Sequence, residues 1–317
     1  MNSTTEILPP SPLESTPEDH GETRGAAKQA GLAILFYALF QVCLPLIRIP
    51  AVRLPIIVQL LLIVIPTMAF MFLQVRLALC IIRLRLSRLP AILLGWVSLK
   101  IWWMTFLISP RLHHGAPLPM AIGYELLRHT MQDLTVTLAC TFAGIVLSAI
   151  VKDKNTLLPV AFIAMPIDYL GAMTPIGFTN NMIKAHPGIV KAVAVSVPKL
   201  SGPGGISLSP IGLIGPGDAL FMAFYFAVVL RLSLNIKRTF WWMYWLLSAS
   251  LIAVLIIPSF FALAALVPMG IAVIAANGSR FSLTRAEWFA FLYAGILVLF
   301  LAVGFYLYSH TQLMGGH

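Results

Sequence analysis

Long apolar runs, separated by short polar and basic stretches, make up most of the chain after residue 30. An α-helix needs about 20 apolar residues to cross a bilayer, and most of these runs approach that length. The pattern predicts an all-α fold, a polytopic transmembrane helix bundle of about nine spans. The predicted spans lie at 31–47, 56–75, 89–109, 131–151, 156–176, 211–232, 240–257, 260–277 and 287–308.

Three stretches break this pattern. Residues 1–29 are rich in Pro, Ser, Thr and Glu and are expected to form a disordered tail, after which the run from Gly31 forms a retained first helix and not a signal peptide. Leu112–Leu127 is expected to be an interfacial segment or a loop. In the long loop 177–210, the Val-rich segment Val190–Val197 predicts a short strand, and the Gly- and Pro-rich Leu200–Pro210 is expected not to be helical.

Composition supports the membrane interpretation. The 317 residues are 59% hydrophobic and only 10% charged, whereas soluble domains average about 25% charged residues. The net charge of +10 comes from Lys and Arg concentrated between the apolar runs, which fits membrane topology better than nucleic-acid binding. The three cysteines, Cys43, Cys80 and Cys140, lack the CxxC spacing of a zinc site, and neither a disulfide framework nor a metal site is indicated.

The basic residues also predict an orientation. With nine spans, 13 Lys and Arg residues fall on the same side as the amino terminus and seven fall on the opposite side. Loops rich in Lys and Arg face the cytoplasm. The amino terminus is therefore expected to be cytoplasmic, so that the helix with Asp168 runs outward and the helix with Asp218 returns.

Two carboxylates lie inside predicted spans. Asp168 belongs to the run 156–176, and Asp218 follows Gly215-Pro216-Gly217 at the start of the run 211–232. Ionisable groups in a bilayer core are expensive, so each suggests a function. Each also has a structural alternative: Asp168 could hydrogen-bond to a neighbouring helix, and Asp218 could cap a helix in a glycine packing motif. A third acid, Asp133, is expected to act at a helix start and not in chemistry.

Several motifs together resemble those of the GxGD intramembrane aspartyl proteases, the signal peptide peptidase and presenilin family. The GPGD motif ending at Asp218 is similar to the GxGD motif, and the segment 174–182 resembles the one that follows the first catalytic Asp in signal peptide peptidases. Phe261-Ala262-Leu263 and the following Leu266-Val267-Pro268 look like the PAL motif and its continuation. The resemblance covers about Leu158–Ala276, and departures occur at Ile167, Pro216 and Phe261, where the family commonly has Tyr, Leu and Pro.

The resemblance implies a presenilin-like fold and an intramembrane aspartic endopeptidase, closer to signal peptide peptidase. Its catalytic residues would be Asp168 and Asp218, and its substrate-binding residues would be Gly215, Pro216, Gly217, Phe261, Ala262 and Leu263. The expected partners are the lipid bilayer and the transmembrane helices of substrate proteins or signal peptides, with no nucleic acid. The expected location is the cell membrane of a prokaryote or the endoplasmic reticulum of a eukaryote.

The chemistry expected from two such acids needs no cofactor. One carboxylate, ionised, activates a water held between the pair, and the other, protonated, donates a proton to the scissile carbonyl. The expected organisation is a tail at 1–29, a helical scaffold at 30–152, a catalytic core at 153–278 and an extra helix with a tail at 279–317. The alternatives are a type IV prepilin peptidase, a proton-coupled transporter that uses the two acids, and an inactive relative that binds membrane helices.

Overall fold

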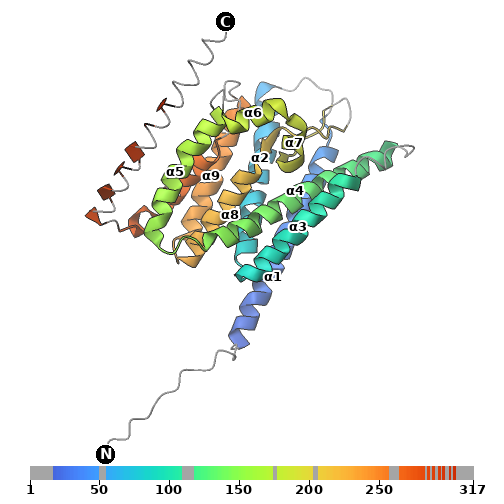
Figure 1. Cartoon of the computed structure of the whole chain (residues 1–317). Coiled ribbons are helices and arrows are strands. Elements are labelled where there is room, and N and C mark those ends of the chain that lie inside the picture. Colours follow the sequence, from blue (N-terminus) through green and yellow to red (C-terminus); the bar gives the residue numbers. More distant parts are fainter. Residues whose placement is uncertain are drawn as a thin grey trace, which may run out of the picture.

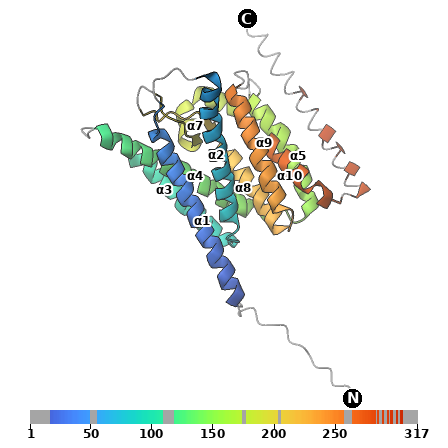
Figure 2. The same ribbon diagram turned by 180° about the vertical axis from the view of Figure 1, so that it is seen from behind.

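The computed structural model contains a bundle of long helices with one small sheet near one end (Figures 1 and 2). It describes residues 17–49, 55–108, 118–173, 177–202, 206–256 and 264–282, together with scattered positions between 284 and 304. The helices are α1 (Pro17–Cys43), α2 (Ile56–Ile82), α3 (Arg88–Ile108), α4 (Leu118–Ser148), α5 (Lys154–Met173), α6 (Phe178–Ala185), α7 (Pro187–Val193), α8 (Pro216–Arg231), α9 (Ile236–Ile256) and α10 (Leu266–Asn277), with short 3-10 turns η1 (Leu44–Leu46) and η2 (Gly278–Arg280).

Five of these helices are long and apolar enough to cross a membrane. The candidate spans are 24–46, 56–82, 88–107, 120–148 and 154–172. These helices support the prediction of an all-α helical membrane protein. The described residues contain five candidate spans, so the prediction of nine spans is supported only in part. Helix α10 has 12 residues where the sequence predicted the span 260–277, and most of the predicted span 287–308 lies outside the described residues.

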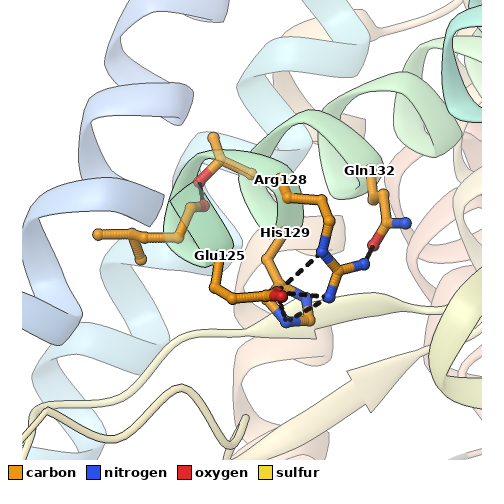
Figure 3. A network of polar contacts seen from close by, with 6 residues as sticks. Glu125, Arg128, His129 and Gln132 are labelled. Atoms are coloured by element: carbon orange, nitrogen blue, oxygen red, sulfur yellow. Dashed lines mark hydrogen bonds and ion pairs between the residues drawn. The ribbon is translucent and has the colours of Figure 1, made fainter. Parts of the chain in front are cut away.

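Helix α4 starts much earlier than the predicted span 131–151. It begins at Leu118, so residues 118–127 are helical and not a loop. Its first half carries charges that pair along the helix: Arg128 contacts Glu125 at 2.6 Å and donates a hydrogen bond to Gln132 at 3.1 Å, and His129 lies beside them (Figure 3). Residues three and four apart share a helix face, and this pairing explains how a charged stretch continues an otherwise apolar helix.

The first helix and the predicted strand also differ from the prediction in their bounds. Helix α1 begins at Pro17, inside the stretch 1–29 that the sequence predicted as a disordered tail. The predicted strand at Val190–Val197 forms only at its end, where β1 (Val195–Val197) pairs antiparallel with β2 (Gly212–Ile214), because the earlier residues belong to α7. Among the described residues of 200–210, no helix forms, as expected.

The core lies between α4, α8, α2 and α9, and α10 joins this group to α5. Glycines set two of the contacts. A Cβ at Gly144 of α4 would lie 2.7 Å from the Phe224 backbone nitrogen of α8, and a Cβ at Gly270 of α10 would lie 2.7 Å from the Met165 side chain of α5. Neither contact would accept even an alanine without displacement, so the absence of a side chain permits both close helix approaches.

Candidate functional site

Asp168 lies one and a half turns before the end of α5 and points to the start of α10. Its Oδ2 accepts a hydrogen bond of 2.9 Å from the backbone N–H of Leu266, the first residue of α10. The first backbone N–H groups of a helix have no partner inside the helix, and a carboxylate there also favours the helix dipole. The structural alternative for Asp168, a hydrogen bond to a neighbouring helix, therefore describes a contact that it does make.

Asp218 occupies the third position of α8, immediately after the Gly-Pro-Gly turn. Its Oδ2 accepts a hydrogen bond of 3.1 Å from the N–H of Gly215, which precedes the helix. Pro216 stands at the first helical position, where its missing N–H leaves no helical bond unmade. A Cβ at Gly215 would lie 3.2 Å from the Asp218 carboxylate, whereas nothing lies within 4 Å of a Cβ at Gly217. The motif thus fixes the carboxylate and leaves the backbone at Gly217 open.

The two acids meet around the start of α10. Asp218 lines a cavity of about 20 Å³ together with Ala265, which directly precedes the residue bonded to Asp168. The Asp168 and Asp218 carboxylates also interact electrostatically with each other. A cavity of this size has room for about one water molecule. The structure therefore brings together the two acids that the sequence singled out, although α5 packs chiefly on α10 and not on α8.

Two polar side chains beside the acids were not predicted. Gln74 of α2 is 1% exposed and lines the same cavity as Asp218, and its Oε1 has no hydrogen-bond partner among the described residues. Tyr225, two helical turns after Asp218, is fully buried, interacts electrostatically with Asp168, and has a hydroxyl that is likewise unpartnered in the described part of the chain. A buried polar atom without a partner costs about 1–3 kcal/mol, so both are candidates for contact with a bound molecule.

Asp133 has a different position from the one predicted. It lies in the middle of α4, at 3% exposure, and not at a helix start. Ser196 of β1 donates hydrogen bonds to its carboxylate from both the backbone N–H and the side chain. Gln41 of α1 donates to Asp133 at 3.4 Å and to the Ser196 carbonyl at 3.2 Å. Asp133 and Gln41 thus occupy the outer edge of β1.

The sheet leads directly into the acidic motif. In the β1–β2 register Ser196 lies opposite Leu213, and β2 ends at Ile214, one residue before Gly215. The backbone groups of Ser196 are hydrogen-bonded to Gln41 of α1 and Asp133 of α4, from the side away from β2. Ser196 and Leu213 therefore form a pair whose backbone groups point away from each other. Leu213 is 37% exposed, and its backbone groups lie on the other edge of the sheet, which no described strand pairs with.

Part of the predicted site lies outside the residues that the structure describes. Phe261, Ala262 and Leu263, together with Pro258, lie outside the described residues, as does 174–176 of the segment after Asp168. Gly215, Pro216 and Gly217 lie beside Asp218 as described above. Within the described part of the chain, no cluster of His, Cys, Asp and Glu has the arrangement of a metal site.

Comparison with known proteins adds no relative. No protein-family model, no curated protein and no solved structure matches the chain.

Proposed function

We propose that the chain is an intramembrane aspartic endopeptidase, in which Asp168 and Asp218 hydrolyse a peptide bond of a membrane-spanning substrate. The single observation that carries the proposal is the convergence of the two acids on the start of α10, where Asp168 binds the Leu266 N–H and Asp218 shares a water-sized cavity with Ala265. The GPGD motif and its resemblance to the GxGD proteases, closer to signal peptide peptidase, support the same assignment.

The two acids have complementary roles in this proposal. One carboxylate, ionised, takes a proton from the attacking water, and the other, protonated, donates a hydrogen bond and then a proton to the scissile carbonyl. Two interacting carboxylates at short range share one proton, which provides both forms at once. Their titration belongs to the pair, so the roles are assigned to the pair and not to either residue.

The substrate has to be extended before it is cut, because the backbone of a helix is already hydrogen-bonded and shielded. We assign its binding to the edge of β2 that faces away from β1, where no described strand pairs. The N–H and C=O of Leu213 point outward there, and an extended peptide that pairs with them would add a third strand. The outer edge of β1 does not suit this role, because Asp133 and Gln41 already bind the backbone groups of Ser196 there.

Access to the acids is lateral in this proposal. Ile167 and Tyr169 flank Asp168, and they are 61% and 53% exposed. Exposed Ile and Tyr side chains on a membrane helix are typical of a surface that faces lipid, so we place the bilayer at the edge of the site on the α5 side. Gly217 is exposed as well, with open space where a side chain would stand. A transmembrane substrate would reach the acids from the lipid without crossing water.

The test is cleavage of a single-span substrate by the purified full-length chain in liposomes. Asp168→Asn and Asp218→Asn keep the shape and one acceptor oxygen, and each is expected to lower the cleavage rate by on the order of 10²–10⁴-fold. Asp153→Asn, which changes an exposed acid just before α5, is the matched control and should cleave at the wild-type rate. Cleavage by both dyad variants at the wild-type rate would refute the proposal. Proton flux without cleavage would favour the transporter.

A further inference from the structure

A basic cavity of about 180 Å³ lies between α1, α2 and α9, which run side by side (Figure 2). Arg76 of α2 and Arg83, which directly follows α2 with helical backbone angles, line it, and their spacing of seven residues places them on one side of the helix. Lys237 and Trp241 enter it from the start of α9, and Gln29 enters from α1. Three cations from two helices, with a Trp, therefore line a single hollow.

These cations have no acidic counterpart in the described structure. Among side chains that the structure describes, the ion pairs join Glu125 to Arg128 and His129, and none involves the cations of the cavity. Arg76 lies six residues before the end of α2, about 9 Å along the helix axis. Its guanidinium lies 5.9 Å from the centre of the Phe72 ring. Arg76 is exposed near the end of a candidate span, where an arginine side chain can reach the headgroup region of a bilayer, so an anion bound there would stabilise it.

A second, apolar cavity continues from the basic one toward the bilayer interior. It has a volume of about 230 Å³, and it shares Gln29 and Arg76 with the first cavity. Its other lining residues are apolar and belong to α1 and α2: Leu32, Ala33, Phe36, Phe72 and Leu73. On α1 they follow Gln29, and on α2 they precede Arg76, so on both helices they lie farther from the helix ends that form the basic cavity. The two cavities therefore form a polar site followed by a hydrophobic groove.

We propose that this pair of cavities binds one anionic phospholipid, with the phosphate among Arg76, Arg83 and Lys237 and part of an acyl chain in the groove between α1 and α2. Basic pockets between transmembrane helices recognise such headgroups. The lipid belongs to the leaflet on the amino-terminal side, where α2 ends and α9 begins. The proposal does not depend on protease activity. It also goes beyond the general excess of basic residues on that side, because it needs these three cations around one cavity.

The experiment is native mass spectrometry of the purified full-length chain in detergent with added palmitoyl-oleoyl-phosphatidylglycerol. The pocket variant is Arg76→Gln with Arg83→Gln. Its matched control is Arg238→Gln with Arg280→Gln, which removes two exposed charges at the same end of the bundle but outside the cavity. Each cation near an anionic headgroup contributes about fivefold in affinity. The pocket variant should therefore lose roughly 25-fold, and the control should retain the lipid.

Three further arms make the result specific. Arg76→Lys with Arg83→Lys should keep most of the binding, which separates loss of charge from loss of fold. Phosphatidylcholine should bind much more weakly than phosphatidylglycerol. Glycerol phosphate and dihexanoyl-phosphatidylglycerol should also bind more weakly, because they fill the groove poorly. Equal losses in the pocket and control variants would overturn the site, and equal binding of the short- and long-chain lipids would overturn the assignment of the groove.

Discussion

The hydrogen bonds around Asp133 make a quantitative prediction about the strand that precedes the acidic motif. Asp133→Ala removes the acceptor of two Ser196 donors, and it also removes a contact with Gln41. Each buried donor left without a partner costs about 1–3 kcal/mol. Two such donors give a loss of roughly 2–6 kcal/mol in the free energy of unfolding.

Asp133→Asn separates the hydrogen bonds from the charge. The amide keeps the volume and one acceptor oxygen, so only one hydrogen bond is lost, and the neutral group is easier to bury than a carboxylate. The expected loss is about 1 kcal/mol. The measurement is the SDS-induced unfolding of purified protein, with Asp153→Asn as the exposed control, since Asn caps the start of α5 as well as Asp does. An exposed substitution should stay within about 0.5 kcal/mol of wild type.

The same variants should also cleave more slowly than wild type, even where they remain fully folded. The strand held by Asp133 pairs with β2, and β2 ends directly before Gly215 and Asp218. A displaced β1 therefore moves both the proposed substrate edge and the acid. The assay is cleavage at a temperature at which every variant is folded. If Asp133→Ala unfolds as wild type does, or if Asp133→Asn is the less stable of the two, the assigned hydrogen bonds do not hold β1.

Three other predictions concern Tyr225, Gly144 and the orientation of the chain. Tyr225→Phe removes a hydroxyl with no partner among the described residues, so it should leave thermal stability unchanged or higher, and a lowered cleavage rate would indicate a role beside Asp168. Gly144→Ala should destabilise by about 1–3 kcal/mol because its Cβ would overlap the α8 backbone, while Gly123→Ala on the same helix, with open space around it, should be neutral or stabilising in the same unfolding assay. Arg238→Cys, in a chain without its three native cysteines, should react with an impermeant thiol reagent only from the cytoplasmic side, and labelling from outside would reverse the proposed orientation.

The pairing of Asp168 with Asp218 could be anticipated from the sequence, because charge inside an apolar run is conspicuous. The position of Asp133 could not be anticipated in the same way. Hydropathy placed the start of its span near residue 131, since Glu125, Arg128 and His129 interrupt the apolar run. In the structure Glu125 and Arg128 form an ion pair along α4 with His129 beside them, and the helix extends back to Leu118.

The polar residues that hold β1 did leave a signal in the sequence. Tyr37 and Gln41 are four residues apart, as are Asp133 and Thr137, so each pair lies on one helix face. Two polar faces on different membrane helices suggest that the helices meet there. The strands themselves have three residues each, and Ser196 of β1 is bound by side chains of α1 and α4. Strand pairs this short depend on tertiary contacts, and local sequence does not predict them.

The two acids belong to different parts of the bundle, and this division explains how the site depends on the fold. Helix α4 fixes Asp218 twice, through Asp133 at the sheet and through Gly144 at the α8 backbone. Asp168 instead belongs to α5, which packs on α10 at Gly270. The Asp168 carboxylate accepts a hydrogen bond from the first backbone N–H of α10. The start of α10 is therefore where the part of the bundle that holds Asp218 contacts the part that holds Asp168. A small movement of α10 would change the separation of the acids while each kept its own local hydrogen bonds.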